Sequence, residues 1–177
     1  VMADFTEACL FLADGARGGC DRVTFCKTDA RESRCVRASL PGASTGGGGA
    51  NFSGAVFTQA EARASVWLEA QLTQADFSYA NLEDSYFLQA QGDQTAIFAA
   101  GVKGAVLRKS RWSHARFVQA DLAHLDGTEA RFDTCQFTGA NAFGAQLQGA
   151  CFETCDFRNV DLQRAFVDAD VRRGIVQ

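Results

Sequence analysis

The amino-acid sequence predicts an all-β solenoid, a rod of short stacked coils around one continuous core. The first observation is a five-residue period: a small residue, an outward residue and a large apolar residue recur in "ADFSYANLEDSYF" at 75–87. This period matches neither an α-helix, at about 3.6 residues, nor a strand, at about 2. The second observation is that the pattern runs without a slip over most of the chain. Two inward positions in every five require a chain that turns at short intervals, and such coils must stack to pair their backbone groups.

We call the large apolar residue of each repeat the centre, and the small residue stands two positions before it. From residue 52 onward there are 24 centres in one register, of which four are small: Ala62, Gly92, Gly127 and Ala142. An earlier block of eight centres runs in its own register from Phe5 to Leu40. We therefore expect a single domain over 1–177, with repeats at 3–40 and 50–169 and a flexible loop, "PGASTGGGG", at 41–49.

The repeat units resemble those of a known family. "ADFSY", "ANLED", "ADLAH", "ARFDT", "ANFSG" and "VDLQR" are similar to the A-(D/N)-(L/F)-x-x units of pentapeptide-repeat proteins, and the resemblance covers almost the whole chain. It implies a right-handed quadrilateral β-helix with four repeats in each coil. The 32 repeats would form eight coils, which at about 4.8 Å per coil make a rod of about 38 Å.

Four-sided coils place residues that are 20 apart in one column. One such column of centres is rich in aromatic residues, and we expect it to be buried as a stack along the core; its members are Phe57, Phe77, Ile97, Phe117, Phe137 and Phe157. Cys135 and Cys155 are also 20 apart, both at small inward positions. Their spacing permits a disulfide in principle, although two stacked thiols are the favoured interpretation.

Composition excludes several classes of protein. There is no apolar run of 18 residues, so no transmembrane helix is expected. The start, "VMADFTEACL", is not typical of a signal peptide, and because the repeat is already running there we expect the chain to be part of a larger protein. The seven Cys are odd in number and form no C-x-x-C, and there are two His. These features favour reduced, buried thiols in a cytoplasmic protein over disulfides or zinc.

No catalytic, cofactor-binding or metal-binding constellation is evident. His114 and His124 both stand two positions after a centre, where the resemblance places turn residues in solvent. The glycines at 46–49 are followed by no Lys-Ser or Lys-Thr, so they are not expected to bind phosphate. We therefore expect neither enzyme activity nor a cofactor.

Two surface features are candidates for an interaction surface. Residues 103–116 carry five basic residues and no acid, and three of them, Arg108, Lys109 and Arg111, share one corner of the coil. This corner could bind an acidic partner, although a solvated basic ring is the simpler interpretation. The second feature is the outward column Val66, Tyr86 and Val106, which should form an exposed apolar stripe.

These observations favour a non-enzymatic protein-interaction or structural scaffold module of a bacterial pentapeptide-repeat protein. The partner is an unidentified protein, and the flat faces also allow a homodimer; neither a membrane nor direct nucleic-acid binding is expected. The alternative that the family resemblance implies is a DNA-mimicking binder and inhibitor of DNA gyrase or topoisomerase, of the quinolone-resistance type. That activity needs continuous negative charge, and the column through Asp76 continues instead to Ala96 and Arg116.

Overall fold

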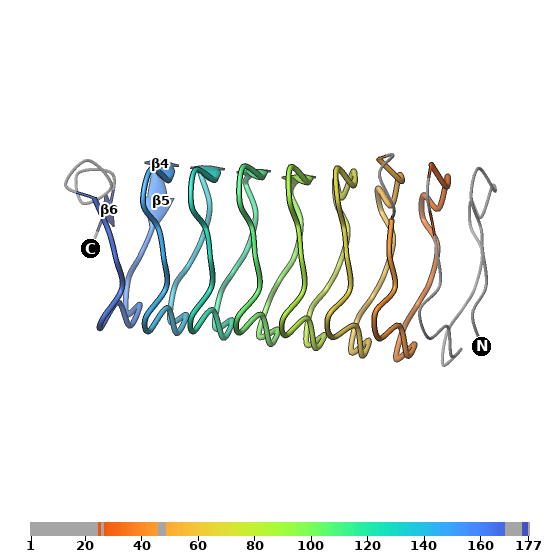
Figure 1. The fold of residues 1–177 in the computed structure, drawn as a ribbon, viewed down its shortest axis with the longest axis horizontal. Coiled ribbons are helices and arrows are strands. Elements are labelled where there is room, and N and C mark those ends of the chain that lie inside the picture. Colours follow the sequence, from red (N-terminus) through yellow and green to blue (C-terminus); the bar gives the residue numbers. More distant parts are fainter. Residues whose placement is uncertain (1–24, 26, 46–48, 169–174, 177) are drawn as a thin grey trace.

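A computed structural model describes residues 25–168, except 26 and 46–48, together with Ile175–Val176. Figure 1 shows a row of coils stacked along one axis. Bridges between coils join residues that are 20 apart, such as Val56 with Asp76 and Asp76 with Ala96, so each coil has four sides of five residues. The chain folds as a right-handed quadrilateral β-helix, which confirms the predicted fold class. The repeats expected at 3–24 lie outside the described residues.

One face of the rod carries the longest strands. A parallel sheet contains, in spatial order, β1 (Gln91–Asp93), β2 (Arg111–Ser113), β3 (Arg131–Asp133) and β4 (Cys151–Glu153). Gln91 pairs with Arg111, and Arg111 pairs with Arg131. On the next face β5 (Cys155–Asp156) pairs in parallel with β6 (Ile175–Val176). Elsewhere in the described ranges the coils meet through single parallel bridges.

Backbone hydrogen bonds tie each coil to both of its neighbours. The N–H of Asp76 donates to the carbonyl of Ala55 in the preceding coil at 2.9 Å, and the N–H of Phe77 donates to the carbonyl of Ala96 in the following coil at 2.8 Å. An isolated coil would leave these groups unpaired, which costs free energy wherever they are shielded from water. Stacking is therefore a condition for folding and not a later event.

The corners of the coil are formed by tight turns. The second residue after the centre has a positive φ throughout the described repeats, for example 60° at Gln59 and 58° at Gln119. Most of these residues are not glycine, although the left-handed conformation is unfavourable for residues with a Cβ. The Asp or Asn of the repeat supports the turn: Asp76 Oδ1 accepts a hydrogen bond from the Ser78 N–H at 2.8 Å. This contact explains why these two residue types recur at the outward position.

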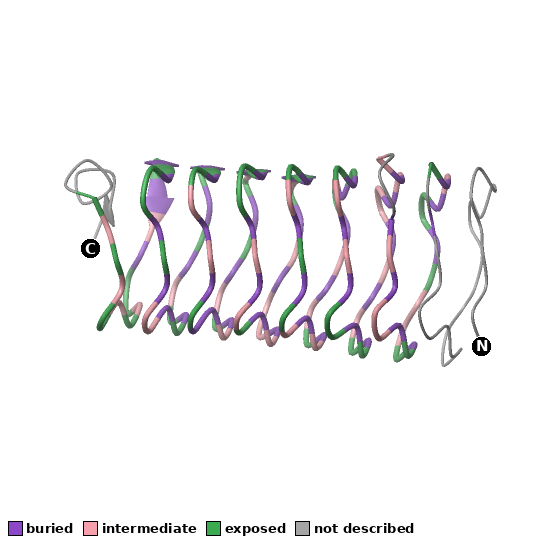
Figure 2. Ribbon diagram, viewed as in Figure 1, coloured by how far each residue is buried: buried purple, intermediate pink, exposed green. Residues whose placement is uncertain are grey.

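The core is a continuous column of apolar side chains inside the rod. Figure 2 shows buried and more exposed segments alternating around each coil. The aromatic column expected from the sequence is buried, and its six members are at most 5% exposed. Phe57 and Phe77 stack with their ring centroids 4.7 Å apart, and Phe117 and Phe137 stack at 4.9 Å. Ile97 lies between the two stacks and separates them.

The segment 41–49 is not the loop that the sequence predicted. Ala43 and Thr45 are buried and Ser44 forms a bridge with Val66, so residues 41–45 make one more side of a coil. The prediction failed because the centre of this repeat, Thr45, is polar. Its hydroxyl donates a hydrogen bond to the Leu68 carbonyl at 3.0 Å. The bridge from Asp29 to Asn51 spans 22 residues instead of 20, so two extra residues fall between Thr45 and Ala50.

Glycine at two centres makes room for a large neighbour. A Cβ on Gly92 would overlap the Trp112 ring of the next coil and would lie 2.6 Å from Thr95 Oγ1. A Cβ on Gly127 would lie 2.9 Å from Leu147 and 3.2 Å from Leu125. Leu125 occupies a position that is usually small, so the small and large positions are exchanged within this repeat. These glycines are required by packing between coils.

Both tryptophans are partnered by a serine two residues earlier. Trp67 Nε1 donates to Ser65 Oγ at 2.6 Å, and Trp112 Nε1 donates to Ser110 Oγ at 2.7 Å. Each serine stands at the small inward position, where most repeats have alanine. The hydroxyl satisfies an indole N–H that would otherwise be buried without a partner.

We predict that Gly92→Ala destabilises the protein by about 1–3 kcal/mol, because the new methyl group must displace the packed Trp112 ring. Chemical denaturation monitored by circular dichroism measures the change. Gly101→Ala is the matched control: the nearest atom to its Cβ is Asn81 Oδ1 at 3.9 Å, so the substitution should have little effect. Equal losses in the two variants would contradict the packing explanation.

We predict that Ser110→Ala lowers the free energy of unfolding by about 1–3 kcal/mol, since it leaves the Trp112 N–H buried and unpaired. A double-mutant cycle with Trp112→Phe isolates the contact, because phenylalanine has no N–H to satisfy. Ser110→Ala should cost less stability in the Trp112→Phe background. The same cost in both backgrounds would show that the hydrogen bond contributes nothing.

Candidate interaction surface

The outward residues form four columns, one along each face of the rod. Val66 pairs with Tyr86, and Tyr86 pairs with Val106, so the residues expected to form an apolar stripe lie in one column on adjacent coils. Tyr86 is 44% exposed, and the two valines are half-buried. Phe166 belongs to the same column but is separated from the stripe by Asp126 and Gln146.

Two leucines widen this stripe, and the sequence prediction missed them. Leu68 and Leu88 are half-buried and stand directly after the centres Trp67 and Phe87. They are 20 apart, which is the signal that could have identified them. We use the name apolar stripe for the five residues together: Val66, Leu68, Tyr86, Leu88 and Val106.

The predicted basic corner adjoins the apolar stripe. Arg108 Nε lies 3.5 Å from Asp126 Oδ2, and Lys109 Nζ lies 3.7 Å from Glu129 Oε2. Arg111 in β2 points outward beside Arg131 of β3. No ion pair to a described residue is found for Arg111 or Arg131. The structure therefore adds Arg131 to the three basic residues that the sequence placed together.

A surface hollow lies where this corner meets the face of β1 and β2. Its volume is about 660 Å³. Lys109 and Arg111 line one part of it, and Gln89 and Gln91 line another. Glu69 and Gly49 complete the lining. The hollow brings cationic and amide donors together beside the apolar stripe.

In the part of the chain that the structure describes, the carboxylates do not form an uninterrupted acidic face. Asp76 pairs with Ala96, and Ala96 pairs with Arg116, as the spacing predicted. Glu61 accepts a hydrogen bond from Asn81, and Asp121 accepts one from Asn141, each at 3.0 Å. Uncharged residues interrupt the acids of this second column, which reads Glu61, Asn81, Gly101, Asp121, Asn141 and Asp161.

One carboxylate is held in a close ion pair at a corner. Arg158 Nη2 lies 2.7 Å from Asp156 Oδ2, and its Nε contacts Asp156 Oδ1 at 3.0 Å. These hydrogen bonds from Arg158 hold the pKa of Asp156 well below its usual value. Thr138 Oγ1 donates a further hydrogen bond to Asp156 Oδ2 at 3.0 Å, and the Arg158 side chain is exposed. This arrangement suits a surface contact and not an acid–base site.

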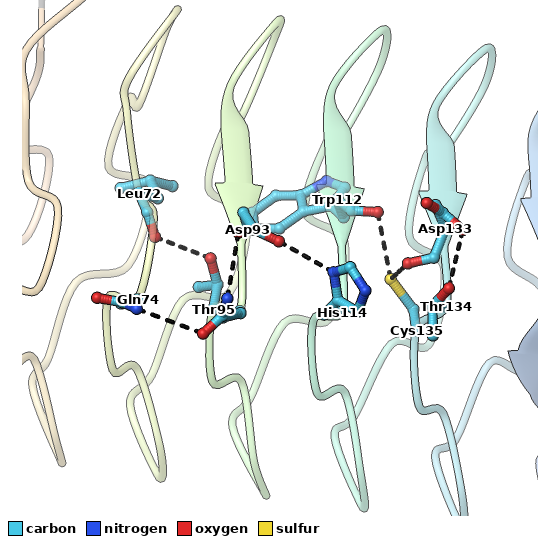
Figure 3. Close-up of polar contacts among 10 residues, drawn as sticks. Leu72, Gln74, Asp93, Thr95, Trp112, His114, Asp133, Thr134 and Cys135 are labelled. Atoms are coloured by element: carbon cyan, nitrogen blue, oxygen red, sulfur yellow. Dashed lines mark hydrogen bonds and ion pairs between the residues drawn. The ribbon is translucent and has the colours of Figure 1, made fainter.

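The cysteines of the described part of the chain are free thiols. Cys135 and Cys155 are buried one above the other, and Cys135 Sγ donates to the Trp112 carbonyl at 3.3 Å (Figure 3). The hydrogen bond with Cys155, together with burial, raises the pKa of Cys135. Cys151 is exposed on β4, so the expectation of buried thiols is wrong for it, because it stands at an outward position. Cys9, Cys20 and Cys26 lie outside the described residues.

The two histidines lie on different corners, as expected. His114 Nδ1 lies 3.1 Å from Asp93 Oδ1 (Figure 3), and the His124 ring packs edge-on against Phe143 with centroids 5.6 Å apart. Within the described ranges, no three His, Cys, Asp or Glu side chains gather in a way that could hold a metal ion. The same part of the chain contains no helix that could serve as a membrane span.

A parallel, four-sided coil with a small and a large residue inside each side defines a class of repeat protein. The family model for pentapeptide repeats matches residues 50–89, 128–159 and 135–168, with eight copies. These parts of the chain are pentapeptide repeats.

One solved structure shows a similar fold, and the chain is also similar to a second one. A trypsin-treated form of QnrB1, a plasmid-mediated fluoroquinolone resistance protein, is 20% identical, covers 99% of this chain and 89% of its own, and has a TM-score of 0.54. HetL, involved in heterocyst differentiation regulation in the cyanobacterium Nostoc, is 22% identical over 93% of this chain and 83% of its own, with a TM-score of 0.46. No curated protein sequence matches the chain. At 20% identity the likeness to the QnrB1 structure extends to the fold alone.

Proposed function

We propose that this chain is a non-enzymatic protein-interaction or scaffold module that binds its partner through the apolar stripe. The single observation that carries the proposal is the alignment of Val66, Tyr86 and Val106 on three successive coils, with Leu68 and Leu88 beside them. Exposed apolar residues scattered singly are ordinary on a protein surface. A contiguous group in fixed register is more typical of a contact surface.

The position of the reactive side chains supports the same proposal. Cys135 and Cys155 are enclosed in the core, and the two histidines lie on separate corners. A nucleophile and a base within hydrogen-bonding reach would be the minimum for acid–base or nucleophilic catalysis. The rod therefore acts through shape and exposed side chains, without turnover.

We predict that the double variant Tyr86→Lys/Val106→Lys loses its partner while remaining folded, because two ammonium groups cannot be desolvated against an apolar surface. Affinity capture from the source organism's lysate, read by quantitative mass spectrometry, measures the loss, and circular dichroism checks the fold. Ala96→Lys/Gln136→Lys, on the opposite face, is the matched control and should keep the partner.

Two outcomes would contradict this proposal. Unchanged capture by the Tyr86→Lys/Val106→Lys variant would show that the apolar stripe is not the working surface. Inhibition of gyrase supercoiling by the wild-type chain would favour the DNA-mimicking alternative, for which the interrupted acidic columns offer no support.

A further inference from the structure

We propose that the partner element is an amphipathic α-helix with carboxylates along one flank, lying on the apolar stripe parallel to the rod axis. This inference rests on the proposed function and specifies the chemistry of the partner. It follows from three properties of the surface, which are its spacing, its edges and the chemistry of its apolar side chains.

The spacing of the apolar stripe suits a helix better than a strand. Val66, Tyr86 and Val106 lie on three adjacent coils, whose spacing is about 4.8 Å. A helix presents the same face once per turn, about every 5.4 Å. Over two coil spacings its side chains therefore shift relative to the coils by about 1.2 Å. A strand presents the same face every two residues, about 6.6 Å. Over the same two coil spacings its side chains shift relative to the coils by about 3.6 Å. Side chains of a helix therefore stay in register with all three coils.

The two edges of the stripe differ in charge. On one edge Arg63 Nη2 lies 3.3 Å from Glu83 Oε2 and 3.2 Å from Asp84 Oδ2. Lys103 is nearby, so the two positive and two negative charges of this edge cancel. On the other edge Lys109 and Arg111 line the hollow together with Glu69. Arg131 lies next to Arg111 on the following coil, and Lys109 is paired with Glu129. The three basic residues outnumber the two acids, so this edge keeps a positive charge that the first edge lacks.

Arg111 and Arg131 are the groups that an acidic flank would meet. The pairing of β2 with β3 places these two residues side by side, and neither has an ion pair with a described residue. Carboxylates at positions i and i+4 of a helix are about 6 Å apart, close to the coil spacing. A helix with such a flank would neutralise two like charges that have no ion pair within the described residues.

The apolar side chains favour a protein over a nucleic acid as the occupant. Four of the five residues of the stripe are valine or leucine, which offer no ring for a base to stack on. The net charge of the chain is −4, which opposes a polyanion at long range. Local basic groups beside an aliphatic surface instead match an amphipathic protein segment.

The test uses a synthetic helical peptide of about 18 residues, with leucines along one face and glutamates on one flank. Its mirror probe carries lysine in place of each glutamate, and a DNA duplex of about 20 base pairs is the third probe. Fluorescence anisotropy with the full chain measures binding. The acidic peptide should bind about tenfold more tightly than the basic one, and its affinity should fall as salt is raised.

Three variants assign the binding to the stripe and its edge. Arg111→Glu/Arg131→Glu should reverse the preference between the two peptides, and Tyr86→Lys/Val106→Lys should abolish binding of the acidic one. Ala96→Lys/Gln136→Lys should bind like the wild type. Thermal melting of each variant checks that it is folded.

Several results would overturn the inference: no binding of the acidic peptide, equal or tighter binding of the basic peptide, or binding of the duplex alone. The proposed function is judged separately by capture from lysate. If capture depends on Tyr86 and Val106 while no peptide binds, the helical partner is wrong and the interaction surface stands. If capture is independent of the apolar stripe, the proposed interaction surface and the proposed helical partner are both wrong.

Discussion

The backbone hydrogen bonds between successive coils are the interaction on which the rest of this structure depends. Each repeat donates one N–H to the coil before it and another to the coil after it, as Asp76 and Phe77 do. This arrangement fixes a register of 20 residues, and the register in turn decides which side chains meet. The aromatic stack and the exposed columns both follow from it. A polar or apolar choice at one position therefore acts on residues 20 away in the sequence.

The register also explains how the rod tolerates departures from its repeat. Gly92 and Gly127 remove a centre where a neighbouring coil fills the space. Thr45 replaces an apolar centre because the Leu68 carbonyl satisfies its hydroxyl. Two extra residues before Ala50 leave the columns on either side aligned, since the bridges from Asp29 and Arg34 simply span 22 residues. Surplus chain can bulge at a corner, whereas a shortfall could not close the coil.

The sequence was sufficient to predict the fold, because the period of five indicates a solenoid and the resemblance to pentapeptide repeats implies its four sides and its right-handed turn. It also placed Val66, Tyr86 and Val106 in one column. It was insufficient wherever a side chain acts across coils in an unusual way. The repeat centred on Thr45 was hidden by its polarity, and the role of Gly92 depends on the tilt of the Trp112 ring. Leu68 and Leu88 were overlooked because turn positions are commonly assigned to solvent.

The most direct test of this account is to remove a whole coil. Deleting residues 121–140 keeps the register of 20 and joins Ala120 to Asn141, so the protein should still melt cooperatively and show a parallel-β circular dichroism spectrum. Deleting 121–142 removes two residues more and leaves a side that is too short to close the coil, so this variant should lose cooperative melting or melt at a much lower temperature. If the two deletions melt alike, stacking in a register of 20 is not what holds the rod together.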